Sequence, residues 1–371
     1  MAVTQFQRKG AQPSPVSFSI GNRKIGPGEP VYIIAELSAN HNQSFEQAVN
    51  IIHAAKEAGA DAVKLQTYTA DTITIRSSRE SFQIKGGTLW DGRTLHDLYA
   101  EAHTPWEWQP ELKCIANGMG LDLFSSPFDG TAVDFLEQMN VPAYKVASPE
   151  LVDIPLIEKI ARTGKPIILS TGMATIEEIS EAVEAASRSG EANVALLKCT
   201  SSYPASAQEM NLRTIPELAQ RFQCPVGLSD HTMDIAVPVA SVALGACIIE
   251  KHLTLSRAHK GPDSDFSLEP QEFREMVKAV RTAEQALGQV HFGATEKENS
   301  SRAFRRSLFV VKDVRRGELF TEENVRSIRP ADGLHTRHLP EILGRVAATD
   351  ISCGTPFRWD LLAESAARKA K

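Results

Sequence analysis

Two histidines each stand at the third position after a short apolar run and are flanked by charged or hydroxyl residues. His231 closes the segment SDH after Val226–Leu228, and His252 closes EKH after Ala246–Ile249. Two neighbouring imidazoles suit a first-row divalent metal such as Mn2+, Zn2+ or Fe2+. With only two protein ligands, the metal would keep open positions for water and a substrate oxygen, which is the arrangement of a catalytic metal. Two separate hydrogen-bonded histidines are the alternative.

Lys64 and Lys145 lie inside apolar runs, where a lysine is seldom found without a partner. Three serines close further runs of the same kind: Ser148, Ser170 and Ser229. Ammonium groups, hydroxyls and loop amides that meet in one place form a cradle for phosphate or carboxylate. A structural ring of salt bridges is the alternative. Lys198 is a weaker candidate, because the pattern around it does not demand this role.

Two carboxylates, Glu36 and Glu150, also stand at the ends of apolar runs. Each could act as a general acid or base, or hold a sugar hydroxyl. Gln66 and Tyr203 could orient a polar substrate, and Asp263 lies in the loop GPD after the last of these runs. Ordinary hydrogen bonding within loops is the alternative for each of them.

Eight strand-like runs must position these residues, and each run ends in polar side chains. The runs are Tyr32–Leu37, Ala62–Leu65, Leu121–Phe124, Ala143–Val146, Pro166–Leu169, Val194–Leu197, Val226–Leu228 and Ala246–Ile249. Helical patterns fill the gaps between them. In Phe45–Ala58, for example, apolar residues recur with a period near 3.6, Ser44 is placed as N-cap and Gly59 ends the helix. The alternation predicts an α/β fold, a (β/α)8 TIM barrel, with its chemistry at the carboxyl ends of the strands.

Composition is that of an ordinary enzyme with a large core. The chain has 371 residues, of which 42% are hydrophobic, and a net charge of −6. That charge does not fit a nucleic-acid-binding protein. We expect no membrane partner, because no run of ~18 apolar residues occurs and the N-terminus lacks the apolar core of a signal peptide. The five cysteines show no CxxC spacing, which favours reduced thiols and a cytoplasmic location.

Four segments are predicted along the chain. Residues 1–29 form a tail and a hairpin that turns at Gly26-Pro27-Gly28, and residues 30–290 form the barrel. Residues 291–302 are a polar linker, and residues 303–365 form a small β-rich domain. Its expected strands are Ser307–Lys312, Asn324–Ile328 and Gly344–Ala347, with Gly354-Thr355-Pro356 before a last strand or helical turn. A domain this short gains little stability alone, so we expect it to dock on the barrel or on a partner subunit.

Eight ordered motifs carry a resemblance that spans about residues 30–362. They are IIAELSANHNQS, GADAVKLQTYTADT, FSSPFD, YKVAS, STGM, LLKCTSSYP, GLSDHT and IEKHLT, and in this order they resemble the sialic acid synthase family. The later segments RRSLFVVKDVRRGEL and SIRPADGL are similar to the SAF, or antifreeze-like, domain of these enzymes. Within the family, WDGRTLHDLY and TPWEW look most like the pseudaminic acid branch, whereas Pro262 resembles the N-acetylneuraminate branch.

The resemblance implies a reaction between phosphoenolpyruvate and an open-chain acetamido sugar. The products are phosphate and a nine-carbon 2-keto acid, and the acceptor implied by the pseudaminic branch is 2,4-diacetamido-2,4,6-trideoxy-L-altrose. N-acetylneuraminate or legionaminate synthesis by the same mechanism is the alternative. A Schiff-base aldolase using Lys64 or Lys145 is an alternative of another class, and a non-catalytic sugar-binding or partner-binding protein is a third.

The resemblance also implies a role for each candidate residue. His231 and His252 would be catalytic and would hold a divalent metal, Mn2+ first and Mg2+ or Co2+ as alternatives, with Glu36 as the catalytic acid or base. Phosphoenolpyruvate would be bound by Lys64, Lys145, Ser148, Ser170, Ser201 and Ser229. The sugar would be bound by Gln66, Glu150, Tyr203, Asp263 and Arg329. Arg329 would reach the neighbouring subunit's active site in a domain-swapped homodimer.

Overall fold

The computed structural model describes residues 17–188 and 193–364, and the chain divides into two compact units between Gly288 and Gln289. The first unit is a barrel and the second is a small β-rich unit. Residues 1–16 of the expected tail and residue 365 of the expected C-terminal domain lie outside the described residues. We describe each unit by itself.

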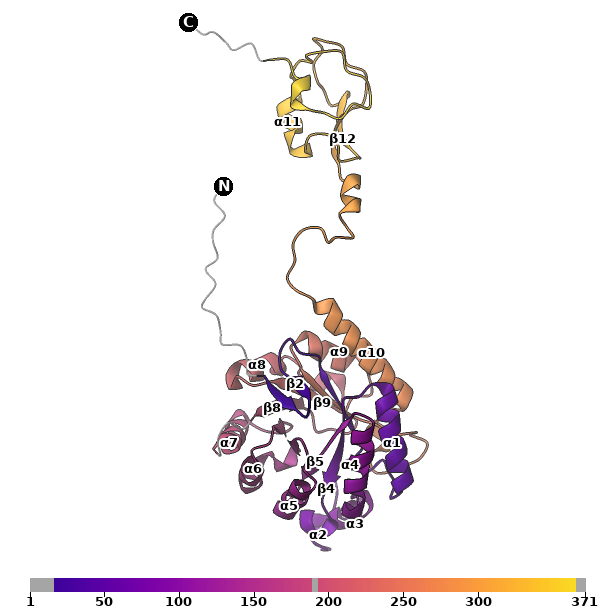
Figure 1. Cartoon of the computed structure of the whole chain (residues 1–371), viewed down its shortest axis with the longest axis vertical. Helices are drawn as coiled ribbons and strands as arrows, with labels where there is room; N and C mark the ends of the chain where they lie inside the picture. The colour runs from indigo at the N-terminus through magenta and orange to yellow at the C-terminus, as the bar shows by residue number, and fades with distance from the viewer. Residues whose placement is uncertain (1–16, 189–192, 365–371) are drawn as a thin grey trace. The chain divides into compact units, whose positions relative to one another are not determined.

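Eight parallel strands close into a barrel in the order β10-β3-β4-β5-β6-β7-β8-β9 (Figure 1). Their bounds are β3 Tyr32–Glu36, β4 Ala62–Thr67, β5 Asp122–Pro127, β6 Tyr144–Val146, β7 Ile167–Ser170, β8 Val194–Cys199, β9 Val226–Asp230 and β10 Ile248–His252. The predicted TIM barrel is therefore confirmed. Most strands run further toward their carboxyl ends than the apolar runs suggested, because the polar residues there also face the barrel interior.

Helices between the strands complete the barrel and cover the sheet. They are α1 Phe45–Ala58, α4 Gln109–Gly118, α5 Gly130–Gln138, α6 Ile154–Ala161, α7 Ile176–Ser187, α8 Thr214–Phe222, α9 Ala236–Ala243 and α10 Pro270–Leu287. Two shorter helices, α2 Ala70–Ile73 and α3 Leu95–Ala102, lie in the long connection between β4 and α4. Helix α1 begins and ends as predicted: the Ser44 side chain accepts a hydrogen bond from the backbone N–H of Gln47, and Gly59 adopts the left-handed conformation with φ of 92°.

A short hairpin covers the amino-terminal end of the barrel. Strands β1, Phe18–Ile20, and β2, Arg23–Ile25, pair antiparallel, so the turn falls at Gly21-Asn22 and the predicted turn at Gly26-Pro27-Gly28 is wrong. A two-residue hairpin turn requires positive φ, which Gly21 supplies with φ of 53°. The apolar side chains of the hairpin are buried in the same cluster as the barrel interior. Asp61, just before β4, accepts hydrogen bonds from Arg23 and Arg281 and so fixes the hairpin at this end.

The second unit is built around its own apolar core. Strands β11, Ser307–Val310, and β12, Val325–Ile328, pair antiparallel, and helix α11 spans Leu339–Ile342. The predicted strand Gly344–Ala347 forms only isolated bridges, from Val346 to Leu319 and from Ala347 to Leu362. Pro356, in the segment after Gly354, forms a further bridge to Phe309. Among the described residues of both units, no helix is long and apolar enough to cross a membrane.

Candidate active site

The register of β3 and β4 places Glu36 directly beside Lys64 at the mouth of the barrel. Lys64 Nζ lies 2.6 Å from Glu36 Oε2, and the two residues are 3% and 0% exposed. Gln66 lies two residues after Lys64 in β4. It donates a hydrogen bond of 3.0 Å to Glu36 Oε1. Burial raises the pKa of Glu36 to about 7, although the Lys64 ammonium opposes this shift. The Glu36 carboxyl group can therefore gain or lose a proton near neutral pH.

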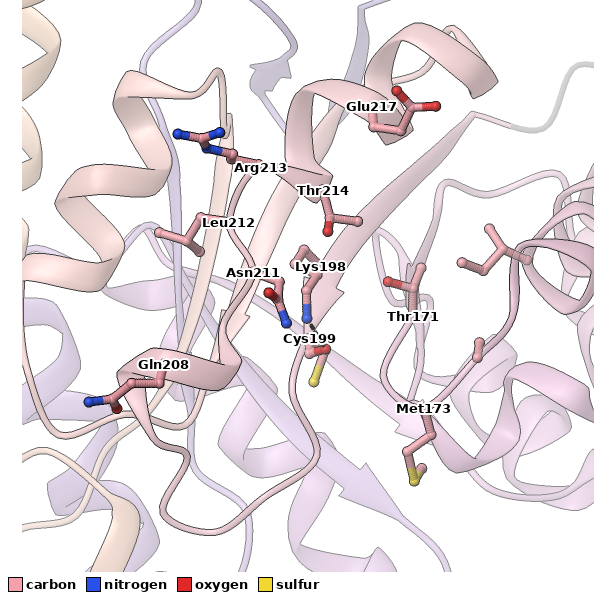
Figure 2. A pocket seen from close by; sticks show the side chains of 12 residues that line it. Thr171, Met173, Lys198, Cys199, Gln208, Asn211, Leu212, Arg213, Thr214 and Glu217 are labelled. Carbon is pink, nitrogen blue, oxygen red and sulfur yellow. Dashed lines mark hydrogen bonds between the residues drawn. The ribbon is translucent and has the colours of Figure 1, made fainter.

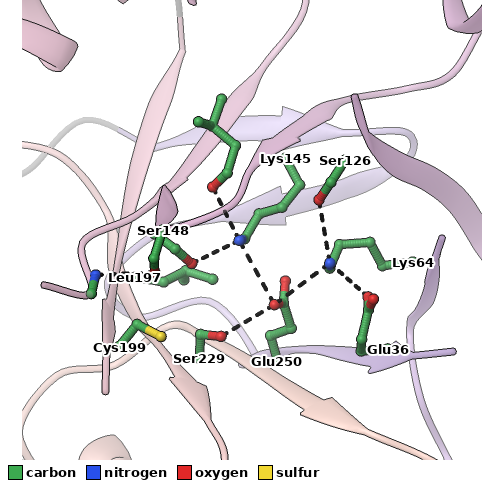
Figure 3. Close-up of polar contacts among 12 residues, drawn as sticks. Glu36, Lys64, Ser126, Lys145, Ser148, Leu197, Cys199, Ser229 and Glu250 are labelled. Carbon is green, nitrogen blue, oxygen red and sulfur yellow. Dashed lines mark hydrogen bonds and ion pairs between the residues drawn. The ribbon is translucent and has the colours of Figure 1, made fainter. Parts of the chain in front are cut away.

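Glu250 lies between the two buried lysines, as Figure 3 shows. Its Oε1 atom is 3.8 Å from Lys64 Nζ and 3.8 Å from Lys145 Nζ, and it accepts a 3.2 Å hydrogen bond from Ser229 Oγ. Its Oε2 atom is buried and has no hydrogen-bond partner among the described residues. The salt-bridge ring that the sequence left open is thus present in part, and Glu250 is the member that sequence reasoning missed.

Lys145 and a group of serines lie on the other side of Glu250, and we keep for them the name anion cradle from the sequence prediction. Lys145 Nζ donates a 2.7 Å hydrogen bond to Ser170 Oγ, and burial lowers the pKa of this lysine. Ser148 Oγ accepts a 3.1 Å hydrogen bond from the backbone N–H of Gly172. A Cβ atom at Gly172 would lie only 2.4 Å from Ser201 Oγ and 2.6 Å from Ser148 Oγ. The glycine therefore lets these two hydroxyls approach each other.

His231 and His252 are neighbours at the ends of β9 and β10, with ring centroids 5.3 Å apart. His231 Nδ1 lies 3.0 Å from the carbonyl oxygen of Thr200, a contact that fixes the ring and leaves Nε2 available. His252 Nδ1 is buried and has no hydrogen-bond partner among the described residues. Burial and then the nearby His231 lower the pKa of His252, which keeps its ring neutral. A neutral, unpartnered imidazole beside an oriented one fits a divalent metal with two protein ligands.

A larger ligand set is not found at this site. Within residues 17–188 and 193–364, no group of three or more histidine, cysteine, aspartate or glutamate side chains is arranged to hold a metal. Cys199 lies closest to the pair, with Sγ 4.0 Å from His231 Nδ1. Burial raises the pKa of this thiol, but the contacts with His231 and Ser148 outweigh burial and lower it to about 7. Sequence reasoning missed Cys199, because a single cysteine at a strand end carries no spacing signal.

Two of the residues expected to bind the sugar, Gln66 and Asp263, are linked through Ser38 by hydrogen bonds. Gln66 donates to Ser38 Oγ over 3.2 Å as well as to Glu36, and Ser38 Oγ in turn donates to Asp263. Burial raises the pKa of Asp263. Glu150 follows β6, its Oε2 atom is buried without a partner among the described residues, and burial raises its pKa to about 7. Arg329 belongs to the second unit, where it is exposed directly after β12.

Three aromatic side chains, Trp90, Tyr203 and Phe266, pack against one another, and we call them the aromatic wall; Tyr203 and Phe266 contact the histidine pair. The Tyr203 ring centroid lies 4.6 Å from that of His231, and Phe266 lies 4.9 Å from both Tyr203 and His252. Trp90 lies 5.7 Å from Tyr203. Of the three, only Tyr203 was predicted. Trp90 is in the motif WDGRTLHDLY, but no periodicity in the segment around it indicated its position.

Lys198 lies apart from the other two lysines. It lines a cavity of about 930 Å3 between the loops that follow β7 and β8, together with Thr171, Asn211 and Arg213 (Figure 2). Its Nζ atom donates hydrogen bonds of 2.7 Å to the carbonyl oxygen of Cys199 and 3.1 Å to Thr200 Oγ1. Since side chains alternate along a strand, Cys199 faces the barrel interior and Lys198 faces away from it. Lys198 is not part of the anion cradle.

Comparisons with known proteins agree with this geometry. Residues 51–292 match the model of the NeuB family, and residues 305–363 match the SAF domain. A pseudaminic acid synthase of Campylobacter jejuni is 47% identical over 91% of this chain and 98% of its own length. An N,N'-diacetyllegionaminic acid synthase of Legionella pneumophila is 35% identical over 91% of this chain and 98% of its own. The crystal structure of spore coat polysaccharide biosynthesis protein SpsE from Bacillus subtilis superimposes with a TM-score of 0.64 at 33% identity, covering 94% of this chain and all of that one.

Proposed function

This chain belongs to the NeuB family, and we propose that it is a pseudaminic acid synthase. The reaction joins phosphoenolpyruvate to 2,4-diacetamido-2,4,6-trideoxy-L-altrose, with release of phosphate and formation of a nine-carbon 2-keto acid. The choice of acceptor is supported by the higher identity to the pseudaminic acid synthase, 47%, than to the legionaminic acid synthase, 35%. Legionaminate or N-acetylneuraminate synthesis is the alternative within the same mechanism.

One observation carries the reaction class: two buried lysines and several hydroxyls converge beside a pair of imidazoles at one barrel mouth. Lys64 and Lys145 supply positive charge where water is largely excluded, so they can neutralise a phosphate and a carboxylate strongly. Ser148, Ser170, Ser201 and Ser229 supply hydroxyl donors around the same space. A doubly anionic substrate such as phosphoenolpyruvate matches this set of donors.

The side chains of the mouth can hold both substrates and move the protons of the reaction. C3 of phosphoenolpyruvate attacks C1 of the sugar aldehyde, water adds at C2, and cleavage of the C–O bond expels phosphate. Glu36 is proposed as the base that takes the proton from water, and this role is supported by Lys64 and Gln66, which both stabilise its ionised form. The sugar is oriented over the cradle by Gln66, Asp263, Glu150 and Tyr203. Holding the two substrates next to each other in this way lowers the entropic part of the activation barrier.

His231 and His252 would hold the divalent metal, Mn2+ first and Mg2+ or Co2+ as alternatives. The metal supplies Lewis-acid polarisation of the acceptor's aldehyde. The carbonyl of Thr200 holds the His231 ring in position for this role.

We extend the proposal to the assembly and the location of the protein. Family resemblance supports a domain-swapped homodimer in which Arg329 of one subunit reaches the acceptor in the other. The acidic net charge, the biosynthetic function of the relatives and the cysteine pattern support a cytoplasmic enzyme.

The proposal is tested by phosphate release from phosphoenolpyruvate in the presence of Mn2+, with three acceptors compared. These are the trideoxy-altrose, the corresponding 2,4-diacetamido-2,4,6-trideoxymannose, and N-acetylmannosamine. Turnover with the altrose alone is expected, whereas preference for either mannose sugar assigns the enzyme to another branch. The lowered pKa of Lys145 would also suit a Schiff-base aldolase, and a borohydride-trapped adduct on Lys64 or Lys145 would replace the proposed mechanism.

A further inference from the structure

Trp90 reaches the active site from a loop that is far away in the sequence from the other members of the aromatic wall. The loop lies between α2 and α3, and Ile84 and Arg93 pair across it through a 2.9 Å backbone hydrogen bond. Asp91 accepts hydrogen bonds of 2.8 and 2.9 Å from the backbone of Gly87 and Thr88. These contacts hold the tip of the loop and present the half-buried indole of Trp90.

The indole contacts both loops that carry the outer sugar-binding residues. Its Nε1 atom donates a 2.9 Å hydrogen bond to the carbonyl oxygen of Pro262, the residue directly before Asp263. Its ring packs against Tyr203 at 5.7 Å and against Phe266 at 6.4 Å. Trp90 therefore touches one residue proposed to bind the acceptor, Tyr203, and the chain neighbour of another, Asp263, without belonging to the anion cradle.

The aromatic wall also gives the acceptor a direction. Its inner end contacts His231 and His252, where the proposed reaction places the aldehyde at C1. Tyr203 comes next and Trp90 lies beyond it, so a sugar that extends outward along the wall brings its far end to the indole. In a six-carbon acceptor the far end is C6.

The indole has no polar group left to offer at that position. Indole nitrogen is a donor only, and the single N–H of Trp90 is already bound to Pro262. Phe266, which packs against the indole, is 1% exposed, so the apolar surface at this position is the face of the indole itself. A methyl group gains contact with such a surface, whereas a hydroxyl would lose water without gaining a hydrogen bond.

From these contacts we infer that Trp90 is a specificity residue that selects acceptors with a methyl group at C6. The inference rests on the proposed function and deepens it, since a 6-deoxy sugar is the acceptor proposed for this enzyme. An apolar pocket discriminates against an added hydroxyl by ~10- to 100-fold, and we expect discrimination of this size.

The experiment compares kcat/KM for two acceptors that differ at one position. One is 2,4-diacetamido-2,4,6-trideoxy-L-altrose and the other is its analogue with a hydroxyl at C6. Trp90→Gln places an amide that can bind both Pro262 and a hydroxyl, so the preference for the deoxy sugar should fall ~10-fold or more. KM for phosphoenolpyruvate should stay unchanged. Trp90→Leu keeps an apolar surface without a donor and should retain the preference while weakening binding of both acceptors.

Trp106 provides the matched control, because its Nε1 also donates to a backbone carbonyl, that of Tyr68, over 3.1 Å, and its ring packs on Phe135. Trp106→Gln should leave the ratio of kcat/KM for the two acceptors unchanged. The inference is overturned if Trp90→Gln lowers kcat/KM equally for both acceptors, or if Trp90→Leu removes the preference for the deoxy sugar. It is also overturned if Trp106→Gln shifts this preference as much as Trp90→Gln does. Wild-type enzyme that turns over neither acceptor would instead overturn the proposed function.

Discussion

Lys64 and Glu36 are direct partners in the register of β3 and β4, and their side chains form a 2.6 Å ion pair that is almost completely removed from water. Removal of one partner of a buried pair leaves an uncompensated charge and costs about 3–5 kcal/mol. At this position the pair also lies beside the anion cradle and the histidines. Substitutions here should therefore keep the shape of the side chain, so that catalysis can be separated from folding.

Glu36→Gln should reduce kcat by about 10²- to 10⁴-fold, the usual contribution of a positioned base. The folded protein holds Glu36 protonated below pH 7, because burial raises its pKa to about 7. If the ionised form takes the proton from water, wild-type activity rises as the pH passes through about 7, and the glutamine variant lacks this rise. Glu150→Gln is the control, since the pKa of Glu150 is also about 7 and the rise should survive its loss. A rise that persists in Glu36→Gln would assign it to another group.

Glu250→Gln should make the protein bind inorganic phosphate more tightly than the wild type does. The substitution removes the negative charge that lies 3.8 Å from both Lys64 and Lys145, and an incoming anion can replace it. A ligand that binds only the folded state raises Tm by an amount that grows with its affinity, so a fixed phosphate concentration should raise Tm more in the variant.

Glu137→Gln controls for a general effect of charge, since Glu137 pairs with Lys165 and Tyr144 away from the mouth. An equal or smaller phosphate-induced shift in Glu250→Gln than in the wild type would contradict a counter-ion role for Glu250.

Chelation with EDTA should abolish phosphate release, and added Mn2+ should restore it. His231→Ala and His252→Ala should each lower bound metal as well as activity, because each removes one of two proposed protein ligands. Metal content after gel filtration, measured by plasma mass spectrometry, provides the readout. His96→Gln is the control, since this histidine of α3 is paired with Asp71 of α2. Full activity in enzyme shown to be free of metal would exclude the proposed metal function.

Arg329→Ala and His252→Ala should each be inactive alone and regain part of the activity when their subunits are mixed. In a heterodimer, one mouth would combine intact histidines with an intact Arg329 from the other subunit. Subunits with different affinity tags allow the heterodimer to be isolated and assayed. Verified heterodimers without any activity would count against an arginine that acts in trans.

The barrel could be predicted because parallel strands that are buried on both faces read as apolar runs between helical patterns. The carboxyl ends of most strands could not be predicted from the apolar runs. Strand β10 continues through Glu250 to His252, and β4 continues through Gln66 to Thr67, because the upper interior of this barrel is polar. In most of these strands the apolar run therefore stops where the active site begins.

The candidate site could be predicted where its residue types are rare at their positions in the sequence. A lysine inside an apolar run, such as Lys64 or Lys145, indicates a buried charge with a partner, but it does not identify that partner. Glu250 became its evident partner only through the closure of the barrel, which brings β10 beside β3. Trp90 could not be placed at all, since its position depends on a loop held by backbone hydrogen bonds and by Asp91.

The hairpin of β1 and β2 has a consequence for the kinetics of this enzyme. Its buried side chains pack at the amino-terminal end of the barrel, so we expect substrates and products to exchange through the mouth. Lys64 and Lys145 are nearly fully buried, whereas Trp90 and Tyr203 are partly exposed further out. An acceptor seated along the aromatic wall would cover the cradle below it. We therefore expect phosphoenolpyruvate to bind before the sugar, and the nine-carbon product to leave before phosphate.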